Sequence, residues 1–125
     1  MWSNRLGCVV LALAVVSTGC GPRTPKPVYQ VPGGDPARGN LVLETHGCVA
    51  CHTIPGVKYG HGKVGPPLVD FGKRGFIGGV APNTPDNLIK WVMNPQSLKP
   101  RTDMPNMDLT EQEARDVAAY LYTLH

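Results

Sequence analysis

The chain has 125 residues, which suits one domain, and carries 12 basic and nine acidic side chains for a net charge of +3. This charge is too small to indicate a nucleic-acid partner. Its distribution is uneven, since residues 55–101 hold seven basic and two acidic side chains, whereas residues 102–125 hold five acidic and one basic. Only 6% of the residues are aromatic, so the polypeptide alone offers little material for a core.

Residues 1–19 have the layout of an export signal. Arg5 precedes an uncharged apolar run over Leu6–Val16, which is shorter than the roughly 20 residues that span a membrane. The small residues that follow end in Gly19-Cys20, which resembles the bacterial lipoprotein signal, whose cysteine is lipidated. We expect a periplasmic domain, or one on the outer face of the cytoplasmic membrane. Lipidated Cys20 is the favoured tether, and an uncleaved apolar N-terminus is the alternative.

Residues 20–34 are predicted to form an extended tether. They contain four prolines and few apolar residues, a composition typical of a semi-stiff linker. At about 3.1 Å per residue, such a segment reaches roughly 40 Å. The tether leaves residues 35–125 for the folded domain.

The first helix of that domain is predicted to begin at Pro36. Asp35 is a favourable N-cap, and proline suits the first helical position. The helix should stop by Gly47, because glycine favours the end of a helix.

Two further helices are predicted in the second half of the domain. Thr84-Pro85 repeats the same kind of start, and Asn94-Pro95 ends that helix. Thr110 and Glu113 form a capping box for the last helix. Its apolar residues recur at helical spacing: Ala114, Val117, Ala118, Leu121 and Leu124.

The segment between the first two helices, residues 53–82, is rich in glycine and proline and has neither helical nor strand periodicity. So long a loop argues against a conventional core unless the loop wraps a ligand. We therefore expect an all-α domain whose long loops surround a cofactor.

Cys48, Cys51 and His52 form a Cys-x-x-Cys-His motif. Two thiols three positions apart can form thioethers to the two vinyl groups of a haem, and the adjacent histidine then directs its imidazole at the iron. A redox-active dithiol and half a zinc site are the alternatives. The dithiol needs no histidine, and zinc needs four ligands and would have to recruit His46 or His61. The motif predicts one covalently attached haem c with its iron.

A second axial ligand is expected later in the chain, where Met104 and Met107 are the candidates. Methionine is usually core filler. Pro105 biases Met104 toward an extended backbone, and Pro100 also precedes it, so Met104 lies in a stiff segment that can present its thioether. Met107 lies nearer the last helix, where an apolar residue would simply pack. We predict Met104 as the iron ligand.

From Gly34 to Leu124 the sequence resembles the class I cytochromes c, especially the bacterial cytochrome c domains attached to or serving haem-copper oxidases. Residues 34–39 are similar to the first helix of the family, with Gly39 at its close crossing with the last helix. Residues 116–121 are similar to that last helix, with Tyr120 at the crossing. Residues 99–106 resemble the methionine loop, except that Arg101 stands where glycine is common.

The resemblance implies the class I cytochrome c fold, with three main helices and long loops wrapped around one covalent haem. Residues 65–68 look like the family's proline loop, so the Pro66 carbonyl should accept a hydrogen bond from the second ring nitrogen of His52. Arg74 stands in the region that contacts the haem propionates, and Trp91 in the region that packs on the ring. A solvated arginine and an ordinary core tryptophan are the alternatives.

These features predict a one-electron carrier rather than an enzyme, because an iron ligated by histidine and methionine has no open position for a substrate. The expected partners are a quinol-oxidising complex as electron donor and a terminal oxidase or reductase as acceptor. A peroxidase or gas sensor would need a vacant or easily displaced sixth ligand. A fixed subunit of a respiratory complex is a further alternative.

Overall fold

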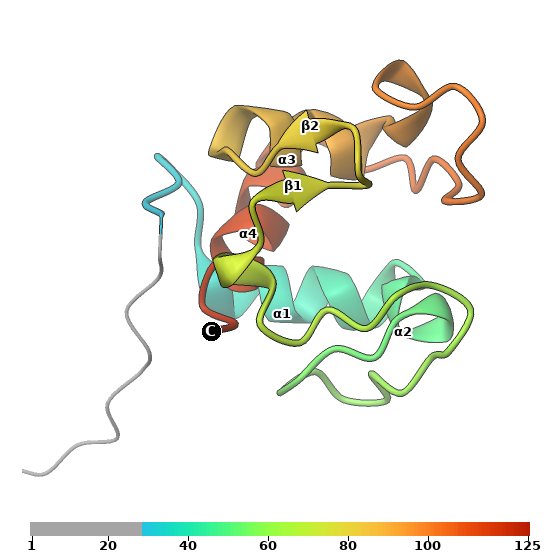
Figure 1. Ribbon diagram of the computed structural model, residues 1–125. Helices are drawn as coiled ribbons and strands as arrows, with labels where there is room; N and C mark the ends of the chain where they lie inside the picture. The colour runs from blue at the N-terminus through green and yellow to red at the C-terminus, as the bar shows by residue number, and fades with distance from the viewer. Residues whose placement is uncertain (1–28) are drawn as a thin grey trace, which may run out of the picture.

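The computed structural model describes residues 29–125, so the predicted export signal, Cys20 and most of the predicted tether lie outside the described residues. The described chain contains four helices and one small hairpin, joined by long loops (Figure 1). The elements are α1 (Pro36–Thr45), α2 (Cys48–Cys51), β1 (Phe76–Ile77), β2 (Ala81–Pro82), α3 (Pro85–Met93) and α4 (Glu111–Leu121). Single 3₁₀ turns cover Phe71–Lys73 and Pro95–Ser97.

The three predicted helices are confirmed as α1, α3 and α4, and so are the residues that cap them. The Asp35 carboxylate accepts backbone N–H groups of the first turn of α1, and Pro36 is the first residue of that helix. The Thr84 hydroxyl accepts the N–H of Asn87 at 3.4 Å. At the start of α4, Thr110 and Glu113 each accept the backbone N–H of the other. All three helices therefore begin where their local sequence satisfies the free N–H groups.

Three features differ from the sequence-based expectation. The last helix ends at Leu121, so Leu124 is not part of it; its carbonyl instead accepts the N–H of Gly72 at 2.8 Å. The Cys-x-x-Cys segment forms a one-turn helix of its own, α2. The two-residue strands β1 and β2 pair antiparallel, with Ile77 opposite Ala81. Strands this short carry no alternation from which a sequence could predict them.

α1 packs mainly against α4, and the two helices cross at Gly39 (Figure 1). A Cβ atom on Gly39 would lie 2.0 Å from the Asp116 carbonyl oxygen and 3.0 Å from the Tyr120 Cβ, so only glycine permits this approach. Tyr120 lies at the crossing and donates its hydroxyl to the Pro55 carbonyl at 2.7 Å. The crossing inferred from the family resemblance is confirmed.

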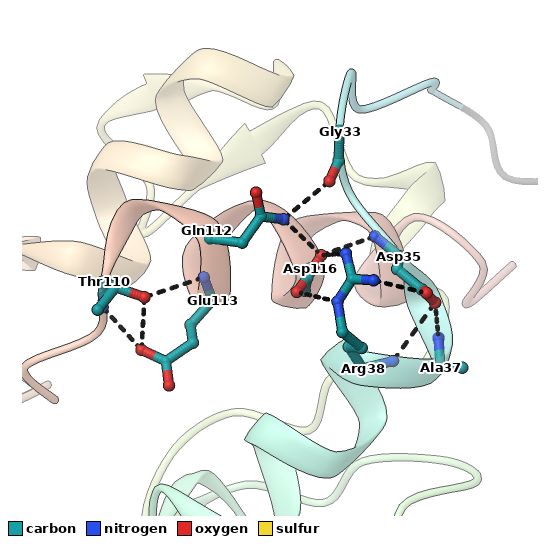
Figure 2. A network of polar contacts seen from close by, with 8 residues as sticks. All are labelled: Gly33, Asp35, Ala37, Arg38, Thr110, Gln112, Glu113 and Asp116. Atoms are coloured by element: carbon teal, nitrogen blue, oxygen red, sulfur yellow. Dashed lines mark hydrogen bonds and ion pairs between the residues drawn. The ribbon is translucent and has the colours of Figure 1, made fainter.

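A polar network joins the outer side of α4 to the start of α1 (Figure 2). The Asp116 side chain is almost fully buried and accepts hydrogen bonds from the Asp35 N–H at 2.8 Å, Arg38 Nε at 2.8 Å and Gln112 Nε2 at 2.9 Å. Gln112 also donates to the Gly33 carbonyl at 2.8 Å. Burial alone would raise the pKa of Asp116, but the hydrogen bonds from Arg38, Asp35 and Gln112 outweigh it and hold this pKa below its ordinary value.

Residues 29–34, the end of the predicted tether, pack against α4 and the C-terminus. Val31 is buried, and Arg115 donates to the Pro32 carbonyl at 3.4 Å. The rings of Tyr29 and Tyr122 meet edge to face, with their centroids 5.0 Å apart. The packed part of the chain therefore begins before Asp35.

Candidate functional site

A cavity of about 480 Å³ opens between α2, the hairpin, α3 and the loop that carries Met104. Its volume lies within the range of cofactor pockets. α2 and the orange Met104 loop, which both contribute to the wall, lie at the same end of the molecule, the loop above α2 in Figure 1. Helical residues supply much of the apolar lining: Leu43, Leu88, Val92, Val117 and Leu121.

Both cysteines of the motif and its histidine line this cavity. The single turn of α2 places Cys48 and Cys51 three positions apart, on neighbouring positions of one helix face. Both are partly buried and are not joined by a disulfide, and burial raises the pKa of the Cys48 thiol. The site thus offers two thiols beside one imidazole.

The imidazole of His52 is held by the proline loop. Its Nδ1 lies 2.7 Å from the Pro66 carbonyl oxygen, the contact that the resemblance implies. A Cβ on Gly65 would lie 2.5 Å from His52 Cε1, so this glycine lets the loop backbone rest against the ring. Because a carbonyl can only accept, Nδ1 is the protonated nitrogen and Nε2 is free to bind a metal.

Met104 and Met107 both line the cavity, but their surroundings differ. The Met104 carbonyl accepts a hydrogen bond from Gln96 Nε2 at 2.8 Å, and its N–H donates to Thr102 Oγ1 at 3.3 Å, so its loop is held by side chains. A Cβ on Gly47 would lie 3.3 Å from the Met107 methyl carbon. Met107 therefore packs at the junction of α1 and α2.

Arg74 and Trp91 also line the cavity, and both are partly buried. The guanidinium of Arg74 donates to the carbonyl of Pro67 and, at 3.1 Å, to that of Val69. It lies 5.5 Å from the centroid of the Phe71 ring. Arg74 is thus attached to the backbone of the proline loop, rather than a free surface cation.

The cavity wall also contains two apolar residues that sequence reasoning missed, Val64 and Phe76, beside two cations of the predicted methionine loop, Lys99 and Arg101. Lys99 Nζ donates to the Gly78 carbonyl at 3.3 Å and so joins the Met104 loop to the hairpin. The only signal in the sequence was that isolated apolar and basic residues stand in loops too polar to form a core. Whether such a side chain faces the cavity depends on the tertiary structure alone.

The donor set does not suit zinc. Among residues 29–125, no three histidine, cysteine or acidic side chains lie together as a metal site requires. His46, one of the histidines that zinc would have to recruit, lies 3.5 Å from the Glu113 carboxylate instead. The cavity is largely apolar and is lined by two thiols, one imidazole and the methionine thioethers of Met104 and Met107. This set of groups fits a covalently attached haem.

The cytochrome c family model matches residues 36–125. The chain belongs to the cytochrome c family. As a member of this family of electron carriers, it carries one covalently attached haem c with its iron. The predicted class I cytochrome c fold, all-α apart from the hairpin, is confirmed.

Three relatives illustrate this membership. Cytochrome c2 of Rhodopila globiformis is 35% identical, and the alignment covers 74% of this chain and 96% of the relative. Cytochrome c oxidase subunit 2 of Alkalihalophilus pseudofirmus is 35% identical over 88 residues, which cover 70% of this cytochrome and 25% of the subunit. The cytochrome thus spans about a quarter of that relative's length. The crystal structure of SoxXA from P. pantotrophus matches with a TM-score of 0.59 and 27% identity, over 73% of this chain and 82% of that one.

Proposed function

We propose that this cytochrome c is a one-electron carrier in an exported or membrane-tethered respiratory chain. In this proposal Cys48 and Cys51 form thioethers to the haem, and His52 and Met104 are the axial ligands of an iron that cycles between the ferrous and ferric states. One observation carries the proposal: the Cys-x-x-Cys-His turn and Met104, 52 positions after the histidine, line the same apolar cavity.

The haem supplies the one-electron chemistry, and the residues of the chain tune it. The hydrogen bond from His52 to Pro66 fixes the ring and raises the basicity of the ligand. The thioether of Met104 raises the reduction potential relative to a second histidine. Trp91 and Arg74 line the cavity, where Trp91 would pack on the haem and Arg74 would serve a propionate, whose burial requires such a donor. With both axial positions filled, no substrate site is left, which favours a carrier over an enzyme.

The proposed setting is the periplasm or the outer face of the cytoplasmic membrane, with lipidated Cys20 or the apolar N-terminus as tether. No helix among residues 29–125 is long and apolar enough to cross a membrane. The proposed donor is a quinol-oxidising complex and the acceptor a terminal oxidase or reductase. The similarity to cytochrome c oxidase subunit 2 supports an oxidase as acceptor.

The axial ligation is tested by replacing Met104 with alanine. The ferric protein should lose its weak long-wavelength sulfur-to-iron absorption band, because the thioether that produces it is gone. The reduction potential should fall, and the freed position should bind cyanide or peroxide. Absorption spectra of the purified ferric protein, with and without cyanide, measure these changes.

Met107→Ala is the matched control, since Met107 lines the same cavity. This variant should keep the band and lose only packing. Its free energy of unfolding should fall by no more than the roughly 2 to 5 kcal/mol that a fully buried methionine contributes. A band that survives loss of Met104 and vanishes with loss of Met107 would exchange the two assignments. A wild-type protein without the band would exclude methionine ligation and restore the peroxidase or gas-sensor alternative.

A further inference from the structure

A path of hydrogen bonds leads from the end of α4 to His52 through residues far apart in the sequence. Its outer end is Tyr122, which directly follows α4 and is fully buried. Its hydroxyl donates to Asn83 Oδ1 at 3.0 Å, and Asn83 is only 4% exposed. Buried hydroxyl and amide groups are costly unless they are paired, so the two side chains fix each other's position.

Asn83 in turn holds the turn over residues 71–75. Its Nδ2 donates to the carbonyls of Arg74 at 2.9 Å and Phe71 at 3.2 Å, and its backbone N–H donates to the Gly75 carbonyl at 2.9 Å. Both hydrogens of the amide group are used, and its oxygen accepts from Tyr122. One buried residue therefore holds three carbonyls of this turn.

Arg74 extends the path to the proline loop. Its guanidinium donates to the carbonyls of Pro67 and Val69, while the preceding carbonyl, that of Pro66, accepts from His52 at 2.7 Å. Arg74 thus holds the carbonyls of Pro67 and Val69, and the imidazole binds the carbonyl of Pro66, one residue before them. Arg74 thereby links the turn to the peptide unit next to the acceptor of the histidine.

We propose that Asn83 and Tyr122 are positioning residues for the axial histidine: they hold the 71–75 turn, through which Arg74 fixes the carbonyl that orients His52. The inference rests on the proposed ligation of the iron by His52. It gives Arg74 a role toward the proline loop in addition to the proposed one toward a propionate. A looser bond to Pro66 lowers the basicity of the imidazole, which stabilises the ferric state less and raises the potential.

The test compares the rates at which two protons of the ferrous haem protein exchange with solvent. One is the His52 Nδ1–H, and the other is the backbone N–H of Leu43, which lies buried in α1 and reports opening of the whole fold. Tyr122→Phe removes one hydroxyl and keeps the ring. We expect the His52 proton to accelerate roughly tenfold more than the Leu43 proton, and the reduction potential to rise. Exchange is followed by NMR, and the potential by redox titration.

Tyr120→Phe is the matched control, because it removes one tyrosine hydroxyl hydrogen bond two positions earlier in the chain, to Pro55, outside the path. It should accelerate both protons by the same factor and leave the potential unchanged. Arg74→Lys keeps the charge but replaces the planar guanidinium, whose Nη2 donates to both carbonyls, with a tetrahedral ammonium group, so it should repeat the selective effect on His52.

Two outcomes would overturn the inference. Equal acceleration of the two protons in Tyr122→Phe would make the pair purely structural. Selective acceleration of the His52 proton in Arg74→Lys but not in Tyr122→Phe would mean that Arg74 acts without Asn83 and Tyr122. Failure of the proposed ligation would be visible separately, since the wild-type spectrum would then lack the features of a low-spin, histidine-ligated haem before any variant is compared.

Discussion

The crossing of α1 and α4 differs from the loop segment over residues 52–83, here called the loop wall of the haem cavity, in how apolar side chains are covered. At the crossing, Ala114 and Ala118 are fully buried, at 0% exposure, among other side chains of the protein. In the loop wall, Val64 is 85% exposed and Phe76 64% exposed, although both are apolar and line the cavity. The crossing is completed by the polypeptide, whereas the loop wall presents its apolar side chains to the haem.

The two regions also satisfy their backbone differently. Helical backbone groups bond within α1 and α4, so side chains are needed only at the helix starts. In the loop wall, the side chains of His52, Arg74 and Asn83 bind backbone carbonyls in place of regular ladders. In a domain this small, the polypeptide therefore completes the packing of one helix pair, while the rest of its structure depends on a few polar side chains and on the cofactor.

The largest expected effect comes from removing the covalent attachment. Cys51→Ser should abolish correct haem attachment and leave the domain largely unfolded, because residues 53–82 have too little apolar surface of their own. Far-UV circular dichroism and hydrogen exchange measure the loss. A compact variant without haem, with protected amides in this segment, would contradict the dependence of the loop wall on the cofactor.

The crossing is tested by adding one methyl group. Gly39→Ala should lower the free energy of unfolding by about 3 kcal/mol, because its Cβ would lie 2.0 Å from a carbonyl oxygen of α4. Gly75→Ala is the control in the loop wall, where a Cβ has no neighbour within 4 Å. Denaturant titration of both haem-loaded variants should show a large loss for the first and almost none for the second. Equal losses would mean that the crossing is no more tightly packed than the loop.

The polar side of the crossing predicts a pH dependence. Since the folded pKa of Asp116 is depressed, its stabilisation is present above its unfolded pKa of about 3.9 and is lost as the pH falls through the lower, folded value. Asp116→Asn should be less stable by about 2 kcal/mol at pH 7. The difference in the free energy of unfolding between this variant and the wild type should narrow below about pH 4. Denaturant midpoints measured from pH 7 downward give this difference, and a difference that does not depend on pH would remove the carboxylate from the explanation.

The smallest effect concerns partner docking, for which we expect the basic residues at the cavity, Lys99 and Arg101, to form the surface. Arg101→Gln should slow electron transfer to the physiological partner a few-fold at low salt, and the difference should shrink as salt rises. Lys90→Gln removes the same charge from α3 at a position outside the cavity wall and should have less effect. The protein used should lack only residues 1–28, because Val31 and its neighbours belong to the packed domain. If both variants slowed electron transfer equally, the effect would come from the net charge of the protein and not from the basic residues at the cavity.

Features that depend on neighbouring residues could be predicted from the sequence alone. The starts of α1, α3 and α4 rest on caps that act within one turn, so Asp35, Thr84 and Thr110 were enough to locate them. The Cys-x-x-Cys-His motif carries its chemistry within five positions, and it led to the cofactor that family membership confirms. The roles of Met104 and Trp91 stay predictions, although both line the cavity.

Features that join distant residues could not be predicted in this way, because they arise from the tertiary structure. The bond between Tyr122 and Asn83 spans 39 positions, and the one between Arg38 and Asp116 spans 78. The packing of residues 29–34, the hairpin and the loop side chains that face the cavity likewise depend on elements elsewhere in the chain. The physical reason is that burial and hydrogen bonding between distant segments follow from how the helices cross. A loop of glycine and proline carries no periodicity from which its buried side could be predicted.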